Sequence, residues 1–211
     1  YYGSEFGIEG RKEKHSDAVL RPAIHLEDYK NALIYLKRAN ELGRNDLWIN
    51  REFSFVYYYL GECEKAYKYL AILKDLGEKD IKLDLMFAYT LSKMGKYEEA
   101  LEYFLKLLEF DEYKNDVSTN YQVAWIYSEF EKAEEALKYF YIAKDLGRND
   151  AWINSQIGWN LLEKDLNKAL EYFNIAKDLG KDDAWLNMQF GFAYSKLGEY
   201  EKAILTFKKV R

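Results

Sequence analysis

The feature that most constrains this chain is an aspartate that returns at nearly constant spacing. Asp46, Asp80, Asp116, Asp150 and Asp183 are separated by 34, 36, 34 and 33 residues. Around two of them the neighbouring letters also return, because LGRNDLWIN at 42–50 matches LGRNDAWIN at 146–154 in eight of nine positions. Such a period is typical of proteins built from stacked supersecondary units, so it predicts architecture before it predicts chemistry.

The residues around the aspartates indicate a junction between two helices. Four of the aspartates follow a glycine by three residues, namely Gly43, Gly77, Gly147 and Gly180. Glycine suits the left-handed conformation just past a helix C-terminus, and aspartate can accept hydrogen bonds from the first amides of the next helix. The third junction, DEYKND at 111–116, is two residues longer and lacks the glycine.

The last copy, 184–210, shows the pattern within one repeat. Counting from the residue after the aspartate, Phe190, Gly191 and Tyr194 occupy positions 7, 8 and 11, and Ala203 and Phe207 occupy positions 20 and 24. This pattern resembles the tetratricopeptide repeat. Two departures define a variant, of the bacterial type with a Gly-x-x-Asp junction: position four carries Asn or Asp instead of the family's tryptophan, and the junction replaces the closing proline.

The resemblance implies an all-α fold, a right-handed superhelical solenoid of helix-turn-helix repeats, with first helices on the inner, concave wall. We expect five repeats in 46–211, starting near 46, 80, 116, 150 and 183, after a leading partial repeat at 12–45 with one matching helix. Residues 1–11 contain GSEF and IEGR, which look like a cloning scar and a factor Xa sequence, so we interpret them as a linker. The fourth copy is one residue short between Gly158 and Ala169, which predicts a different inter-helix turn.

Catalysis is not expected. The only histidines, His15 and His25, precede the repeats, and Cys63 occupies a packing position of the repeat. We therefore predict no enzyme, no cofactor and no metal site. A net charge of −5 does not favour binding to nucleic acid, because its phosphates are also negatively charged. Apolar runs are too short to span a bilayer, so no membrane insertion is expected.

Aromatic residues form the candidate binding set. Position nine is aromatic in every copy, and three copies carry a tryptophan at position two. Because positions two and nine share one helix stripe, opposite the apolar stripe of the first helix, we expect these rings to face the concave groove. The predicted peptide-binding residues are Trp48, Phe55, Tyr89, Trp125, Trp152, Trp159, Trp185 and Phe192. Packing between repeats, or in the core for the position-two tryptophans, is the alternative for these rings.

We therefore predict a non-enzymatic, cytoplasmic protein–protein interaction scaffold that binds a peptide segment in this aromatic groove. Two alternatives stay open at this stage. The chain could be the peptide-sensing domain of a transcriptional regulator, or a module that self-associates end to end. The second follows from Val210 and Arg211 directly ending a second helix, which leaves a stacking face uncovered.

Overall fold

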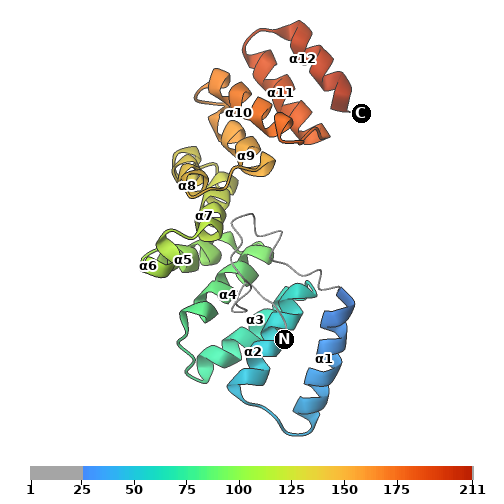
Figure 1. Ribbon diagram of the computed structural model, residues 1–211, viewed down its shortest axis with the longest axis vertical. Coiled ribbons are helices and arrows are strands. Elements are labelled where there is room, and N and C mark those ends of the chain that lie inside the picture. The colour runs from blue at the N-terminus through green and yellow to red at the C-terminus, as the bar shows by residue number, and fades with distance from the viewer. Residues whose placement is uncertain (1–25, 211) are drawn as a thin grey trace. The chain divides into compact units, whose positions relative to one another are not determined.

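The computed structural model describes residues 26–210, where all the regular secondary structure is helical (Figure 1). Contacts divide the chain between Leu107 and Leu108 into two compact units, and each unit is described by itself. The predicted linker at 1–11 and the first part of the leading segment lie outside the described residues.

The first unit contains a single helix followed by two helix pairs. Its helices are α1 (Leu26–Glu41), α2 (Leu47–Tyr59), α3 (Cys63–Asp75), α4 (Ile81–Lys93) and α5 (Tyr97–Leu107). Helix α2 pairs with α3 and α4 pairs with α5, while α1 packs on α2 and α3 packs on α4. Each helix therefore contacts mainly its neighbours along the chain, as expected for stacked repeats.

The second unit contains a short helix followed by three helix pairs. Its helices are α6 (Asp111–Lys114), α7 (Val117–Glu129), α8 (Ala133–Asp145), α9 (Ala151–Leu161), α10 (Leu166–Asp178), α11 (Ala184–Lys196) and α12 (Tyr200–Phe207), with a 3-10 turn at Lys208–Val210. The pairs are α7 with α8, α9 with α10, and α11 with α12. Helix α6 lies within the longer third junction.

The five junction aspartates cap helices, which confirms the expected junction chemistry. Each one precedes α2, α4, α7, α9 or α11 and accepts a hydrogen bond from a backbone amide of the first turn, at 2.7–3.0 Å. At four of the five junctions the glycine three residues before the cap has a positive φ, for example +107° at Gly147. These two residue types therefore end one helix and start the next.

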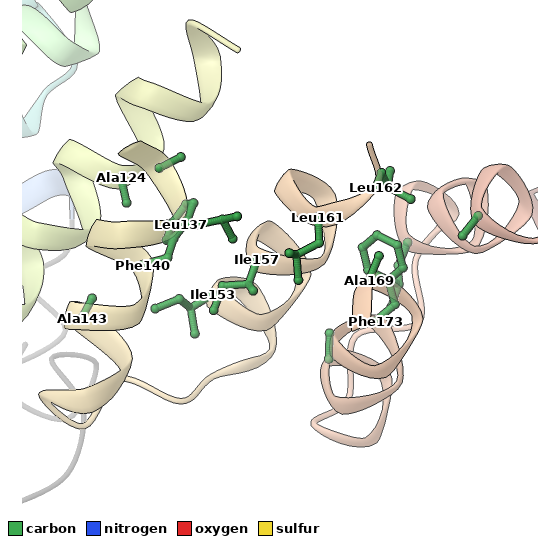
Figure 2. Close-up of a cluster of buried hydrophobic side chains, with 14 of the residues drawn as sticks. Ala124, Leu137, Phe140, Ala143, Ile153, Ile157, Leu161, Leu162, Ala169 and Phe173 are labelled. Carbon is green, nitrogen blue, oxygen red and sulfur yellow. The ribbon is translucent and has the colours of Figure 1, made fainter. Parts of the chain in front are cut away.

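The core of the second unit runs through successive helix pairs (Figure 2). Large rings from second helices, Phe140 and Phe173, are fully buried beside small residues such as Ala124 and Ala169. Burying one such ring contributes about 1.5–3 kcal/mol. Because one cluster takes residues from successive pairs, the pairs stabilise one another rather than folding around separate cores.

The turn between the helices of a pair differs in the fourth copy, as predicted. In the turns before α3, α5 and α12 a glycine has positive φ: Gly61, Gly95 and Gly198. Before α10 the chain instead uses Asp165, whose side chain accepts a hydrogen bond from the amide of Lys168 at 3.0 Å. With one residue fewer, the turn has no left-handed glycine, and Asp165 caps the start of α10 instead.

No helix within residues 26–210 is long and apolar enough to cross a membrane.

Candidate peptide-binding surface

Four of the predicted residues form an aromatic face on α9 and α11 of the second unit. Trp152 and Trp159 lie seven residues apart on α9, and Trp185 and Phe192 lie seven residues apart on α11, so each pair shares one side of its helix. The two helices meet on this face, because the Trp159 and Trp185 ring centres lie 6.2 Å apart. Trp152, Trp159 and Phe192 are 49%, 43% and 44% exposed, and Trp185 is half-buried. We call these four residues the aromatic face.

The remaining position-nine residue of the second unit packs inward. Trp125 of α7 is half-buried and contacts the hydrophobic cluster of this unit. Phe192 of the aromatic face also has a partner below it, because its ring lies edge-on to Phe207 of α12 at 5.6 Å. These rings therefore have one side against the repeat core.

In the first unit the predicted residues do not form a comparable exposed stripe. Phe55 is only 8% exposed, since its ring packs against Tyr29 at 6.2 Å and Tyr59 at 4.6 Å. Tyr89 is half-buried and lies edge-on to Phe104 at 5.2 Å. Trp48 alone of this set is widely exposed, at 51%.

Sequence reasoning missed a cation beside each position-two tryptophan. Arg44, Arg148 and Lys181 each lie two residues before a capping aspartate and bond its carboxylate, at 2.9, 3.0 and 2.7 Å. Each also lies over an aromatic ring. The sequence signal is a basic residue two places before the aspartate and a tryptophan two places after it, which occurs at three of the five junctions.

The three cations differ in the ring that they contact. Arg44 covers its own repeat's Trp48, with 4.4 Å from guanidinium carbon to ring centre. Lys181 lies 4.2 Å from the Trp152 ring centre and 5.4 Å from that of Trp185, and its side chain is only 8% exposed. Its ammonium group thus joins α9 to α11 beneath the aromatic face.

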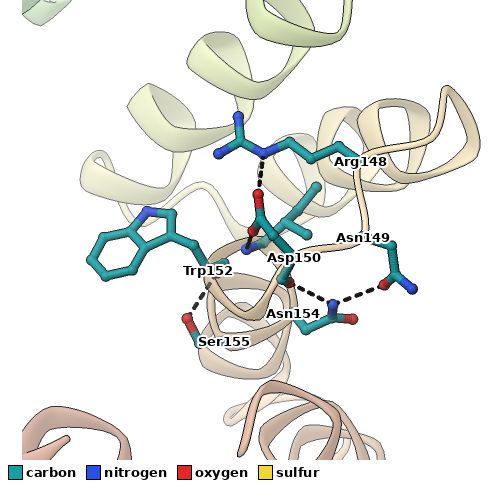
Figure 3. Close-up of polar contacts among 7 residues, drawn as sticks. Arg148, Asn149, Asp150, Trp152, Asn154 and Ser155 are labelled. Carbon is teal, nitrogen blue, oxygen red and sulfur yellow. Dashed lines mark hydrogen bonds and ion pairs between the residues drawn. The ribbon is translucent and has the colours of Figure 1, made fainter. Parts of the chain in front are cut away.

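Arg148 stacks on a ring of the preceding helix pair. Its guanidinium carbon lies 3.6 Å from the centre of the Tyr121 ring of α7, and its Nε–H donates to Asp150 (Figure 3). Burial raises the pKa of Tyr121 to about 12, and the nearby guanidinium only partly offsets that rise. The ring is therefore neutral at physiological pH and offers its face to the cation.

The asparagines at position four are structural. Asn154 is fully buried; its Nδ2 donates to the backbone oxygen of Asp150 at 2.7 Å and to Asn149 Oδ1 at 2.9 Å (Figure 3). The side chains of Asn50, Asn120 and Asn187 donate to their own junctions in the same way. These amides fasten the junction to the first helical turn.

Charged side chains at the far end of the first helices are paired. Lys196 at the end of α11 bonds Glu163, which follows α9. Lys164 bonds Glu134 of α8 at 2.8 Å. Such exposed pairs contribute about 0–1 kcal/mol each, so they orient neighbouring helices more than they stabilise them.

Stacked helix pairs with capped junctions place the chain among the α-helical repeat proteins of the solenoid class, as predicted. The family model described as tetratricopeptide repeat matches residues 85–114 and 186–210. These two segments therefore match the family that the sequence pattern resembles. No curated protein sequence matches it significantly.

Solved structures share this fold at low sequence identity. A MamA fragment from Desulfovibrio magneticus RS-1 is 21% identical with a TM-score of 0.69, covering 78% of this chain and 92% of its own. MamA of strain MSR-1 is 16% identical with a TM-score of 0.67, covering 78% and 94%. PilF of Pseudomonas aeruginosa is 15% identical with a TM-score of 0.66, covering 85% and 82%.

The tetratricopeptide-repeat fold supports a role as a protein–protein interaction scaffold, and proteins of this kind are typically non-enzymatic.

Proposed function

We propose that the chain is an interaction scaffold that binds a peptide segment with apolar or aromatic side chains on the aromatic face of α9 and α11. The observation that carries the proposal is the exposure of Trp152, Trp159 and Phe192 on adjacent helices, joined by the Trp159–Trp185 contact. Exposed rings gathered in this way usually mark an interaction site. We also propose that residues 46–211 comprise five repeats, preceded by a partial repeat at 12–45.

Rings suit this task for two reasons. Tryptophan offers a large contact area at low conformational cost, and buried aromatics dominate the energy of many interfaces. On the aromatic face the rings are already held, since Lys181 and Trp185 support the tryptophans of α9. The pre-ordered rings lower the entropy cost of binding. Affinity therefore resides in the rings, while charged neighbours set orientation.

The other four predicted residues differ in how much of the ring could contact a ligand: Trp48, Phe55, Tyr89 and Trp125. Trp48 offers a second exposed ring, in the first unit. Tyr89 and Trp125 are half-buried, so only part of each ring could contact the peptide. Phe55 is buried by Tyr29 and Tyr59, so in this conformation it supports neighbouring residues rather than touching a ligand.

The test is selection of a random-peptide display library on the folded protein, followed by comparison of variants. We expect enriched peptides to be rich in apolar and aromatic residues and to lose binding to Trp159→Ala, with little change in melting temperature. Tyr35→Ala, which removes a ring that is 76% exposed on α1, is the matched control.

Two outcomes contradict the proposal. The first is that enriched peptides bind Trp159→Ala and Tyr35→Ala alike. The second is that Trp159→Ala lowers the melting temperature strongly while its folded fraction still binds the peptides, which would make Trp159 a core residue.

A second candidate function, end-to-end self-association, is favoured by one observation on α12. Ile204 and Leu205 are 55% and 62% exposed, and Phe207 is 37% exposed. The equivalent rings of earlier second helices, Phe104, Phe140 and Phe173, are fully buried. Ile204, Leu205 and Phe207 thus form an exposed apolar face on α12.

Sedimentation equilibrium over a range of protein concentrations tests this second candidate. We expect Ile204→Glu to remove any concentration-dependent association, and Ile72→Glu, at an exposed position of α3 away from both terminal helices, to leave it in place. A parent protein that stays monomeric at every concentration contradicts self-association.

A further inference from the structure

The repeated nonapeptide contains more than a helix junction needs. Asp80 and Asp116 cap α4 and α7 by the same type of hydrogen bond as Asp46 and Asp150. Yet neither of those two junctions carries the arginine or the tryptophan of LGRND-x-WIN. Capping therefore accounts for the aspartate, and the arginine and tryptophan need another explanation.

The two arginines are held in the same manner. Arg44 Nε–H donates to Asp46, and Arg148 Nε–H donates to Asp150, at 2.9 and 3.0 Å. Both guanidinium groups also stack on a ring, Trp48 for the first and Tyr121 for the second. Stacking and one side-on hydrogen bond fix the plane and direction of each group.

This arrangement leaves the end of each guanidinium available. Within residues 26–210, neither arginine has a hydrogen-bond acceptor at its terminal Nη nitrogens (Figure 3 shows Arg148). Those two nitrogens form the edge that binds a carboxylate with two parallel hydrogen bonds. Each arginine is followed four residues later by an exposed tryptophan, Trp48 at 51% or Trp152 at 49%. The arginine side chains themselves are 50% exposed at Arg44 and 25% exposed at Arg148.

The other junctions lack this combination. Lys181 is enclosed by Trp152 and Trp185, with a side chain only 8% exposed, so its charge is used internally. Arg51 of α2 lies 2.8 Å from Glu78 and 3.8 Å from Asp80, so its guanidinium is already paired with carboxylates around the second junction. An arginine with an open Nη edge, followed four residues later by an exposed tryptophan, therefore occurs at the two copies of the nonapeptide.

We propose that the two copies of LGRND-x-WIN are recognition elements, one in each unit, for an acidic side chain within a partner peptide. The partner's Asp or Glu carboxylate binds the Nη edge of Arg44 or Arg148, and its neighbouring apolar residue covers Trp48 or Trp152. This inference rests on the proposed peptide-binding function and adds the charge that orients the peptide. We assign a negative charge to the partner because the Nη nitrogens of Arg44 and Arg148 are cationic and no described residue accepts a hydrogen bond from them.

The experiment uses acetylated and amidated peptides with a central Leu-Glu-Leu, so that the side chain is their only carboxylate. Their matched controls carry Leu-Gln-Leu. NMR titration follows the indole N–H signals of Trp48 and Trp152 and the Nε–H signals of Arg44 and Arg148. We expect the Glu peptide to shift all four signals and the Gln peptide to bind about tenfold more weakly, as the loss of a charged hydrogen bond implies.

Each copy serves as the control for the other. Arg148→Gln should abolish the shift at Trp152 and leave that at Trp48, and Arg44→Gln should do the reverse. Arg148→Lys retains the charge and should still weaken binding at Trp152, because an ammonium group cannot bind a carboxylate through two parallel bonds. Arg38→Gln, which removes an arginine of α1 that is paired with Glu41, should change neither site.

Three results overturn the inference: equal binding of the Glu and Gln peptides, a shift at Trp152 that survives Arg148→Gln in a folded protein, or no shift of either indole. The proposed function is judged separately, by loss of selected peptides from Trp159→Ala. Peptides that depend on Trp159 but not on Arg148 would retain the aromatic face and exclude carboxylate recognition.

Discussion

A β-carbon placed on Gly158 of α9 would lie 2.5 Å from Cε1 of Phe173 in α10. Glycine at this point is therefore required by the close approach of two helices and not by backbone conformation. The same contact recurs in the last pair, where a β-carbon on Gly191 would lie 2.4 Å from Phe207. The small residue at position eight and the large ring at position twenty-four thus set the spacing within a repeat.

Gly158→Ala should lower the free energy of unfolding by about 1–3 kcal/mol, because the fully buried Phe173 ring must move to admit the methyl group. Urea denaturation measures the change. In a protein that already carries Phe173→Leu, Gly158→Ala should lower the free energy of unfolding by less than it does in the parent. If Gly158→Ala stabilises the protein, as its higher helix propensity alone would suggest, the contact is not limiting.

Glu131 should be replaceable by glycine with a gain in stability. It has φ of 56° in the turn between α7 and α8, where the turns before α3 and α5 use Gly61 and Gly95. Relief of the left-handed strain, less the entropy that glycine loses on folding, predicts a gain of up to about 1 kcal/mol for Glu131→Gly.

The reverse change, Gly95→Glu, is the matched control. No atom lies within 4 Å of a β-carbon at Gly95, so the substitution tests backbone strain without a clash. Urea denaturation should show a loss of about 1–2 kcal/mol. Equal stabilities for both variants and the parent would mean that these turns relax at no cost.

The helices could be predicted from the repeat spacing and from the glycine and aspartate residues at the junctions. An aspartate after a glycine is a local signal, since both residues act on the backbone within a few positions, and Asp46, Asp150 and Asp183 cap helices as expected. The altered turn before α10 followed from a single missing residue for the same reason.

The surroundings of individual rings could not be predicted in that way. Phe55 shares position nine with Trp159, yet it is buried because Tyr29 of the leading helix packs over it. That contact joins segments far apart in sequence and depends on how α1 docks on α2. The stacking of Arg148 on Tyr121 likewise crosses from one helix pair to the next.

Acid should weaken the first repeat through its capping aspartate. The backbone N–H of Ile49 and then the Arg44 guanidinium hold the pKa of Asp46 below its usual 3.8. A group with a lowered pKa in the folded state stabilises that state above the unfolded pKa, and this stability is lost as the pH falls through the folded value. Stability should therefore fall below about pH 4.

Asp46→Asn isolates this effect, because asparagine also caps helices but does not titrate. Denaturation at a series of pH values should give a shallower acid dependence for Asp46→Asn than for the parent. Asp75→Asn, near the C-terminus of α3, removes a carboxylate that caps no helix and is the control. Identical acid profiles for Asp46→Asn and the parent would show that the cap does not couple to pH.

The two copies of the nonapeptide should respond differently to loss of their asparagine. Asn50 and Asn154 each donate to the backbone oxygen of the capping aspartate, at 2.8 and 2.7 Å. Asn154 also accepts a hydrogen bond from Lys144 Nζ at 2.6 Å, and burial lowers the pKa of that lysine. The residue at the equivalent place before Asn50 is Asn40, which carries no charge.

Asn154→Ala should therefore cost more than Asn50→Ala, by about 1–3 kcal/mol, because it also leaves the Lys144 ammonium group without this acceptor. A double-mutant cycle with Lys144→Met tests the cause, since the cost of Asn154→Ala should fall toward that of Asn50→Ala once the charge is gone. Equal costs at the two positions, or a cost of Asn154→Ala that is the same with and without the lysine, would show that the hydrogen bond from Lys144 adds nothing to the junction.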